Sequence, residues 1–434
     1  MYGGATTMTD MSVAAEVELL EGHNRNSGFV RNAAAVAISG AISGVLGLGY
    51  WLIAGRLFPA ESVGSAAAIL STATMVATLS SASIGAIYER FLPVAHSLAR
   101  RMVVLGQLAT IGFALLAAVI IGFVGPVSHY LHGIASVILF AVLQVTLSIF
   151  ALQDHLATAL GVARWTAYKN VAHATLKLAL LAALSTVGTT LSIIASWWAP
   201  ALIAGAAVAL ATRVRLRNSS TSTHTPDLPP ATAMVSFFLG SAGILIAGTL
   251  VPLVMPILVL TRFGASQSAY FAVSWSLISA AVVVMYMMIG PFVSAVVEAP
   301  QSAARGIIVR FGIIIATVAI TAGICLGLIG PLLLKAVGSE YYENGKALMY
   351  YSAGIVPLSA LFILYQAVSR VRRRLRYALV LQVVSAALIL TGVLMTPVDD
   401  GIASIGMWYL AAESAVAVLC VIPLIRGLAL IAKS

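Results

Sequence analysis

The chain has 434 residues, of which 61% are hydrophobic and only 9% are charged. Soluble domains carry about 25% charged residues, so a soluble protein of this composition would lack the polar side chains that cover a surface. A bilayer is therefore the expected solvent. The sequence predicts an all-α polytopic membrane protein, since helices satisfy their own backbone hydrogen bonds in lipid.

A polar segment at 1–27 comes first and is expected to form a cytoplasmic N-terminal tail. Apolar stretches long enough to cross a bilayer, which takes about 20 residues each, then follow one another along the chain. About twelve transmembrane helices are predicted, at 33–55, 62–88, 102–124, 133–153, 167–187, 190–212, 233–260, 266–296, 307–333, 346–369, 376–396 and 403–426.

The basic residues alternate between the two sides of these predicted helices. One side carries 19 Lys and Arg residues and the other carries 4, with one further lysine, Lys177, inside a predicted helix. Cytoplasmic loops of membrane proteins are enriched in Lys and Arg. The richer side is therefore expected to be cytoplasmic, together with both termini, and its clusters are expected to contact anionic membrane lipids rather than nucleic acid.

Short sequence matches recur at an offset of 205 residues, of which the longest is GFVGP at 122–126 with GLIGP at 327–331. Further pairs at the same offset are Phe58 with Phe263, Ala67 with Ala272, and Ser71 with Ser276. Two repeats of six helices have the same orientation in the membrane, which is a transporter architecture with the substrate path between the halves. We expect an N-lobe at 28–212 and a C-lobe at 233–434, joined by a polar cytoplasmic linker at 213–232.

Three segments at predicted helix ends resemble a known family: WLIAGRLFPAESVG at 51–64, ERFLP at 89–93 and GPLLLKAVGSEYY at 330–342. They resemble the Wzx-type polysaccharide flippases of the MOP (MATE-like) exporter superfamily. The resemblance implies two six-helix lobes in a V around a central cavity. It also implies that the protein flips polyprenyl-pyrophosphate-linked oligosaccharides, which are precursors of cell-envelope polysaccharide, across the plasma membrane.

A stripe of cationic side chains descends the fifth predicted helix. Lys169, His173 and Lys177 are spaced four residues apart and therefore share one face, which Asn170 borders. An ionisable group near the bilayer midplane costs at least about 2.5–3.5 kcal/mol, so Lys177 is a functional candidate by default. Gln382 is its repeat-related counterpart. The stripe suits a ligand with a pyrophosphate head that enters from the cytoplasm, so its four residues and Gln382 are candidates for lining a substrate-binding cavity. The alternatives are that Lys169 extends to the interface, that His173 is a packed core residue and that Lys177 forms a structural ion pair.

Other charged residues have candidate roles in coupling, gating or release. Glu413 lies near the midplane, where it either pairs with the buried lysine across the lobes, carries a coupling proton or bonds a neighbouring Ser or Tyr. Glu89 and Arg90 are expected to anchor a helix end at the cytoplasmic face, with gating as the alternative. Arg56 and Arg262 follow the first and seventh predicted helices, as interface anchors or as exit-side phosphate contacts.

The sequence therefore predicts a transporter rather than an enzyme, working by alternating access as a monomeric transport unit. No cofactor is expected, and the coupling ion is left open between H⁺ and Na⁺. Glycosyltransferases or a polymerase of the same pathway are candidate partners. The alternatives are an ion-coupled exporter of drugs or other small molecules and, with less support, a membrane glycosyltransferase or polymerase, which would need a larger outer loop bearing carboxylates.

Overall fold

A computed structural model describes residues 39–40, 42–124, 128, 131, 133–219, 230–289, 292–293, 296, 301–372 and 376–433. The predicted tail at 1–27 lies outside the described residues, and so does 220–229 of the predicted linker. Within the described part every regular element is a helix, which confirms the all-α class.

The first half of the chain contains the helix Ile42–Leu57, followed by five longer helices. These are α2 (Ala60–Phe91), α3 (Ala99–Val124), α4 (Gly133–Ala159), α5 (Arg164–Ala183) and α6 (Thr190–Ser219). The second half contains α7 (Ala231–Met287), α9 (Gln301–Val337), α10 (Ser339–Val371), α11 (Arg376–Met395) and α12 (Ala403–Lys433). Short 3₁₀ turns are η1 (Leu92–Val94), η2 (His96–Leu98) and η4 (Val398–Asp400). Both ends of the segment predicted as a linker are helical, since α6 continues to Ser219 and α7 begins at Ala231.

The long helix α7 is broken at Gly264, whose φ of 86° and ψ of 175° are not helical. Glycine adopts a positive φ without a steric penalty, because it has no Cβ. The break divides α7 into two helical stretches at the place where the sequence predicts a turn between 233–260 and 266–296.

Nine helices of the described part are long and apolar enough to cross a membrane. The helix α5 is not one of them, because its buried Lys169, His173 and Lys177 make it polar. The helix Ile42–Leu57 is shorter than the others, and α7 counts once despite its break. The structure is thus a polytopic helical membrane protein, and the number of about twelve crossings stays a prediction.

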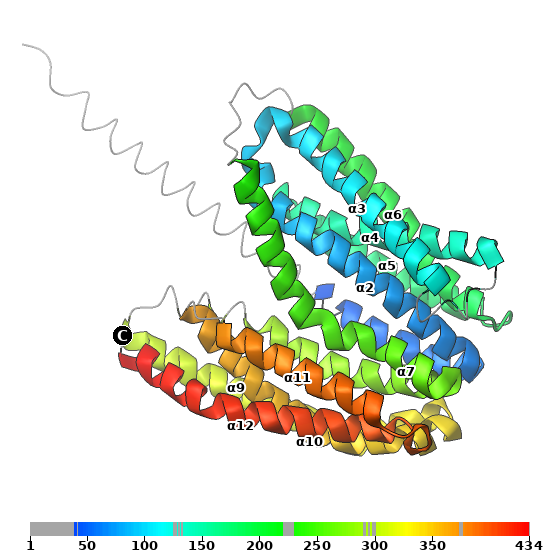
Figure 1. The fold of residues 1–434 in the computed structure, drawn as a ribbon, viewed down its shortest axis with the longest axis vertical. Coiled ribbons are helices and arrows are strands. Elements are labelled where there is room, and N and C mark those ends of the chain that lie inside the picture. The colour runs from blue at the N-terminus through cyan, green and yellow to red at the C-terminus, as the bar shows by residue number, and fades with distance from the viewer. Residues whose placement is uncertain are drawn as a thin grey trace, which may run out of the picture.

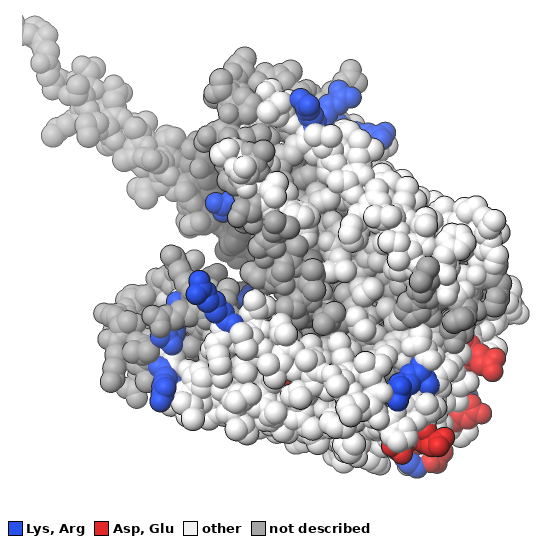
Figure 2. Space-filling view, viewed as in Figure 1, with Lys and Arg blue, Asp and Glu red and all other residues white. Residues whose placement is uncertain are grey.

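The helices form two lobes that diverge toward one end of the molecule (Figure 1). One lobe contains α2 to α6, and the other contains the second stretch of α7 with α9 to α12. Figure 2 shows a hollow between the lobes at the end where Lys and Arg gather, which we call the basic end. Asp and Glu gather at the opposite, acidic end, and the surface between the two ends carries few charges. This separation fits helices that span a bilayer with their basic loops on one side.

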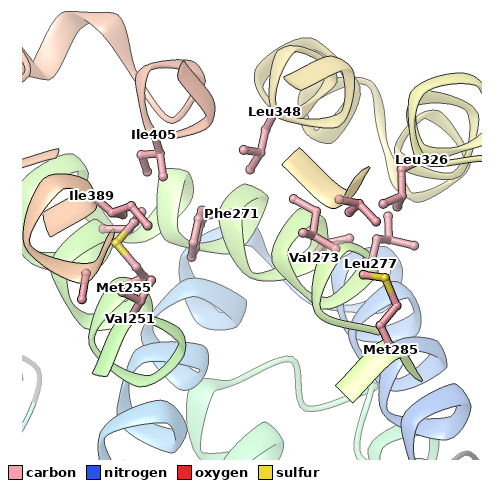
Figure 3. Close-up of a cluster of buried hydrophobic side chains, with 14 of the residues drawn as sticks. Val251, Met255, Phe271, Val273, Leu277, Met285, Leu326, Leu348, Ile389 and Ile405 are labelled. Atoms are coloured by element: carbon pink, nitrogen blue, oxygen red, sulfur yellow. The ribbon is translucent and has the colours of Figure 1, made fainter. Parts of the chain in front are cut away.

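Large apolar side chains occupy both the interior and the outer surface. Figure 3 shows Phe271, Val273 and Leu277 of α7 among side chains of the neighbouring helices of the C-lobe. Leu116 of α3 is 61% exposed and Leu328 of α9 is 69% exposed, on helices that line the outside. Exposed apolar surface of this extent indicates contact with lipid.

The lobes touch at the acidic end, where α2 packs on α7. A Cβ at Gly64 would lie 1.7 Å from the carbonyl oxygen of Ala265 and 2.9 Å from the nitrogen of Ala269. The hydroxyl of Ser268 donates a hydrogen bond of 3.3 Å to the carbonyl of Gly64. Ala269 is offset from Gly64 by the 205 residues of the sequence repeat, so this contact joins positions that the repeat makes equivalent. The molecule is therefore closed at the acidic end and hollow at the basic end.

Candidate functional site

A cavity of about 660 Å³, here called the central cavity, lies between the lobes. Its walls come from the helix Ile42–Leu57, from α2 and from α7. Repeat-related residues face it from the two lobes: Ala67 with Ala272, Ser71 with Ser276, and Thr74 with Ser279. On α2 these positions are spaced by four and three residues, so they share one helix face. Two of the three pairs belong to the sequence repeat, which therefore marks the walls of this cavity.

A second cavity of about 490 Å³, the N-lobe cavity, extends from the central cavity into the first lobe. It is bounded by α2, α4, α5 and α6 and includes Asn170 and His173. Four residues line both cavities: Gly40, Thr74, Lys177 and Trp197. Lys177 thus stands at the junction of the two spaces.

The ammonium group of Lys177 lies 3.9 Å from the centre of the Trp197 ring and 5.2 Å from that of Tyr50. The residue is only 6% exposed, and no ion pair of Lys177 occurs among the described residues. A desolvated cation over an indole ring gains about 2 kcal/mol, which offsets only part of the cost of burying the charge. The hydroxyl of Tyr50 forms a hydrogen bond of 2.7 Å with the hydroxyl of Ser196, which holds the Tyr50 ring in place. The geometry leaves a buried positive charge without a counter-ion beside an open cavity.

The ammonium group of Lys169 has its partners within its own lobe. Its ammonium lies 2.6 Å from Asp154 of α4, donates to the carbonyl of Phe150 and sits over that ring. It is 3% exposed and lines neither cavity, so it does not extend to the interface. Asp154 was not identified from the sequence, although a lone carboxylate at the end of a predicted helix beside a basic stripe was an available signal.

The remaining polar residues of the stripe also have partners. Asn170 donates 3.2 Å to the second oxygen of Asp154, and Nε2 of His173 lies 3.1 Å from the carbonyl of Trp197. A carbonyl accepts only, so Nε2 carries the proton. Both residues line the N-lobe cavity rather than the central one. Among the four residues of the stripe, Lys177 is therefore the one that lines both cavities.

The two C-lobe residues singled out from the sequence, Gln382 and Glu413, lie away from the cavities. Gln382 accepts a hydrogen bond of 3.2 Å from Gln366 and lines neither cavity. Glu413 is 7% exposed and accepts from Ser385 at 3.4 Å, inside the C-lobe. Its other carboxylate oxygen has no hydrogen-bond partner among the described residues. In this conformation the structure does not bring Glu413 and Lys177 together.

Glu89 forms a contact of 2.7 Å with His155 of α4, within the first lobe. The guanidinium of its neighbour Arg90 lies 5.7 Å from the ring centre of Phe91, next to it in the chain. The contact of Glu89 therefore joins α2 to α4 rather than joining one lobe to the other.

The two arginines of the acidic end donate to helix carboxyl ends. Arg56, at the end of the helix Ile42–Leu57, donates 3.2 Å to the carbonyl of Ala336, at the end of α9. Arg262 donates to the carbonyl of Thr396, just after α11. Cations at helix carboxyl ends are favoured by the helix dipole. Each of the two contacts therefore ties an arginine side chain to the carboxyl end of a helix that is distant in the sequence.

Taken together, the central cavity offers three kinds of group. Its described lining includes one uncompensated cation, hydroxyls from both lobes and the indole rings of Trp51, Trp197 and Trp275. None of its lining residues in the described part of the chain is acidic. Such a cavity favours an anionic group joined to a polar, ring-bearing molecule.

The fold and this cavity define a class: polytopic helical membrane proteins whose two lobes enclose a cavity open toward one side. The fold is that of MATE transporters of the MOP superfamily, as the solved structures show. An inward-facing MATE multidrug resistance transporter matches with a TM-score of 0.64 at 12% identity, over 91% of this chain and 96% of that one. The outward-facing form of such a transporter matches with a TM-score of 0.55 at 13% identity, over 94% and 96%.

A third similar structure is a MOP superfamily transporter from Pyrococcus furiosus, described as having a binding pocket of reverse polarity that suggests a different function. It matches with a TM-score of 0.53 at 11% identity, over 93% of this chain and 96% of that one. No family model matches the sequence, and no curated protein matches it.

Proposed function

We propose that the protein moves a polyprenyl-linked glycan across the plasma membrane by alternating access, with Lys177 binding the phosphate that joins lipid to sugar. The observation that carries this proposal is the buried, uncompensated ammonium at the junction of the two cavities. A buried charge is expensive to keep without a partner, so the site is suited to a ligand that supplies one. Lysine binds phosphate as a point charge.

Alternating access is supported by the arrangement of the lobes. The substrate enters from the basic end, where the lobes diverge, and leaves after the contact between α2 and α7 at the acidic end opens. The lipid tail stays in the bilayer while the head group crosses through the central cavity. Positive-inside orientation makes the basic end cytoplasmic.

The second candidate, an exporter of cationic drugs, also fits the fold. It predicts an unpaired carboxylate on the cavity walls. The described lining of the central cavity supplies a lysine instead, and Asp154, which lines the N-lobe cavity, is paired with Lys169 at 2.6 Å. Polarity of the cavity therefore favours an anionic substrate over a cationic one.

The test is transport in reconstituted vesicles. The purified protein is inserted into liposomes that contain a fluorescent polyprenyl-phosphate-linked sugar, and reduction by external dithionite reports which leaflet holds the probe. Lys177→Met should lose at least tenfold in rate. The matched control is Lys335→Met, which removes an exposed cation at the acidic end. Equal rates for the wild-type protein and Lys177→Met would refute the assignment, and an ethidium-like cation transported in place of the lipid would favour the exporter.

A further inference from the structure

The net charge of the site is small and can be counted. Lys177 is the one charged side chain among the described residues that line the central cavity. Lys169 is neutralised by Asp154 at 2.6 Å, so this pair adds no net charge to the neighbouring space. His173 donates a hydrogen bond from Nε2 to the carbonyl of Trp197, and the residue lines the N-lobe cavity. The substrate thus meets one uncompensated positive charge.

The two ways of joining a sugar to a polyprenyl chain differ in charge. A single phosphate bonded to both partners is a diester and carries one negative charge, whereas a pyrophosphate in the same place carries two. A charge that leaves water and finds no partner is strongly penalised. One lysine matches the phosphodiester, and it leaves the second charge of a pyrophosphate without a partner in the central cavity.

The size and chemistry of the walls constrain the sugar. Pockets of about 300–1,000 Å³ enclose molecules of drug size, and the central cavity has about 660 Å³. Its hydroxyls come from Ser71, Thr74, Ser276 and Ser279, and its other polar walls are indole rings. Sugar hydroxyls bond to hydroxyls, and the C–H face of a pyranose ring packs on indole. The described lining contains no second cation that could bind an acidic sugar.

We propose that the head group is one or two neutral sugars joined to the polyprenyl chain through a single phosphate, rather than through the pyrophosphate expected from the family resemblance. This inference rests on the proposed function, because it assumes that the central cavity receives the head group. It deepens that function by fixing the charge of the substrate.

The experiment compares two probes in the same vesicles. Both carry the same hexose and the same fluorescent polyprenyl chain, and they differ only in a phosphate or a pyrophosphate linkage. The wild-type protein should flip the monophosphate probe at least tenfold faster. Similar rates, or a preference for the pyrophosphate probe, would overturn the inference and leave the proposed function standing. If neither probe moves faster than in protein-free vesicles, both fail.

A second variant makes the charge argument falsifiable on its own. Ser276→Lys adds a second cation to the wall of the central cavity, opposite the lobe that holds Lys177. The preference for the monophosphate probe should fall at least fivefold or reverse. The control Ser276→Met adds similar bulk without charge and should keep the preference. Thr74→Lys makes the same test from the first lobe if Ser276→Lys does not fold, and an unchanged preference in the folded variant would overturn the inference.

Discussion

A methyl group at position 64 should force the lobes apart at the acidic end. The Cβ of Gly64→Ala would lie 1.7 Å from the carbonyl oxygen of Ala265, whereas real Cβ atoms essentially never approach closer than 3.0 Å. The two backbones must therefore separate by at least about 1.3 Å, because the clashing atoms belong to a helix backbone and not to a flexible side chain. Overpacking of this kind costs about 1–3 kcal/mol. That is about a 5- to 150-fold shift of population away from the closed arrangement.

Spin labels measure this shift directly. Glu61 of α2 and Glu343 of α10 are exposed at the acidic end on opposite lobes. They are replaced by cysteine in a chain that lacks Cys325 and Cys420, and electron–electron distances are recorded in nanodiscs. Gly64→Ala should move the distance distribution to longer values.

The matched control is Gly112→Ala in α3, since nothing lies within 4 Å of a Cβ at that position. Both substitutions raise helix propensity by about 1 kcal/mol, so this contribution cancels between them. A folded Gly64→Ala protein whose distances equal those of Gly112→Ala would show that α2 and α7 do not form the closed contact described here.

Three further predictions follow from the interior of the protein. Trp197→Leu should slow flipping about 2- to 30-fold in the vesicle assay, because Lys177 loses the aromatic ring beneath its ammonium group. Trp197→Phe keeps an aromatic ring there and should slow flipping less. Lys169→Met should lower the free energy of unfolding by about 1–3 kcal/mol, because Asp154 loses its cation. In thermal denaturation, the double variant Lys169→Met with Asp154→Asn should recover part of this stability. No recovery would contradict the pairing. Glu413→Gln should raise the melting temperature and keep flipping within twofold, because it removes a buried carboxylate with no cation beside it; loss of transport would assign it a role in coupling instead.

The sequence predicted the fold through patterns that can be recognised without knowing which helices pack together. Hydrophobic stretches and alternating basic loops follow from the solvation of helices in lipid, so the helical class was accessible without tertiary information. The 205-residue repeat predicted that Ser71 and Ser276 are equivalent, and the structure places both on the wall of the central cavity.

The partners of the buried charges could not be predicted from the sequence in the same way. The pairing of Lys169 with Asp154 and the position of Lys177 over Trp197 depend on how α5 packs against α4 and α6. The helical stripe gives the direction of the three side chains on α5, but the neighbouring helices decide which of them meets a carboxylate and which meets a cavity. For this reason Lys169 and Lys177 are alike in the sequence and different in the structure.

The measurement that tests the central claim most directly is equilibrium binding of a polyprenyl-phosphate-linked hexose to the purified protein, by native mass spectrometry. Hydrogen bonds to charged groups are worth about 1.5–3 kcal/mol, so Lys177→Met should weaken binding about 10- to 150-fold. Lys177→Arg should retain most of it, and Lys335→Met should match the wild-type protein. Affinities of Lys177→Met and the wild-type protein within twofold of each other would contradict a phosphate site at the junction of the two cavities.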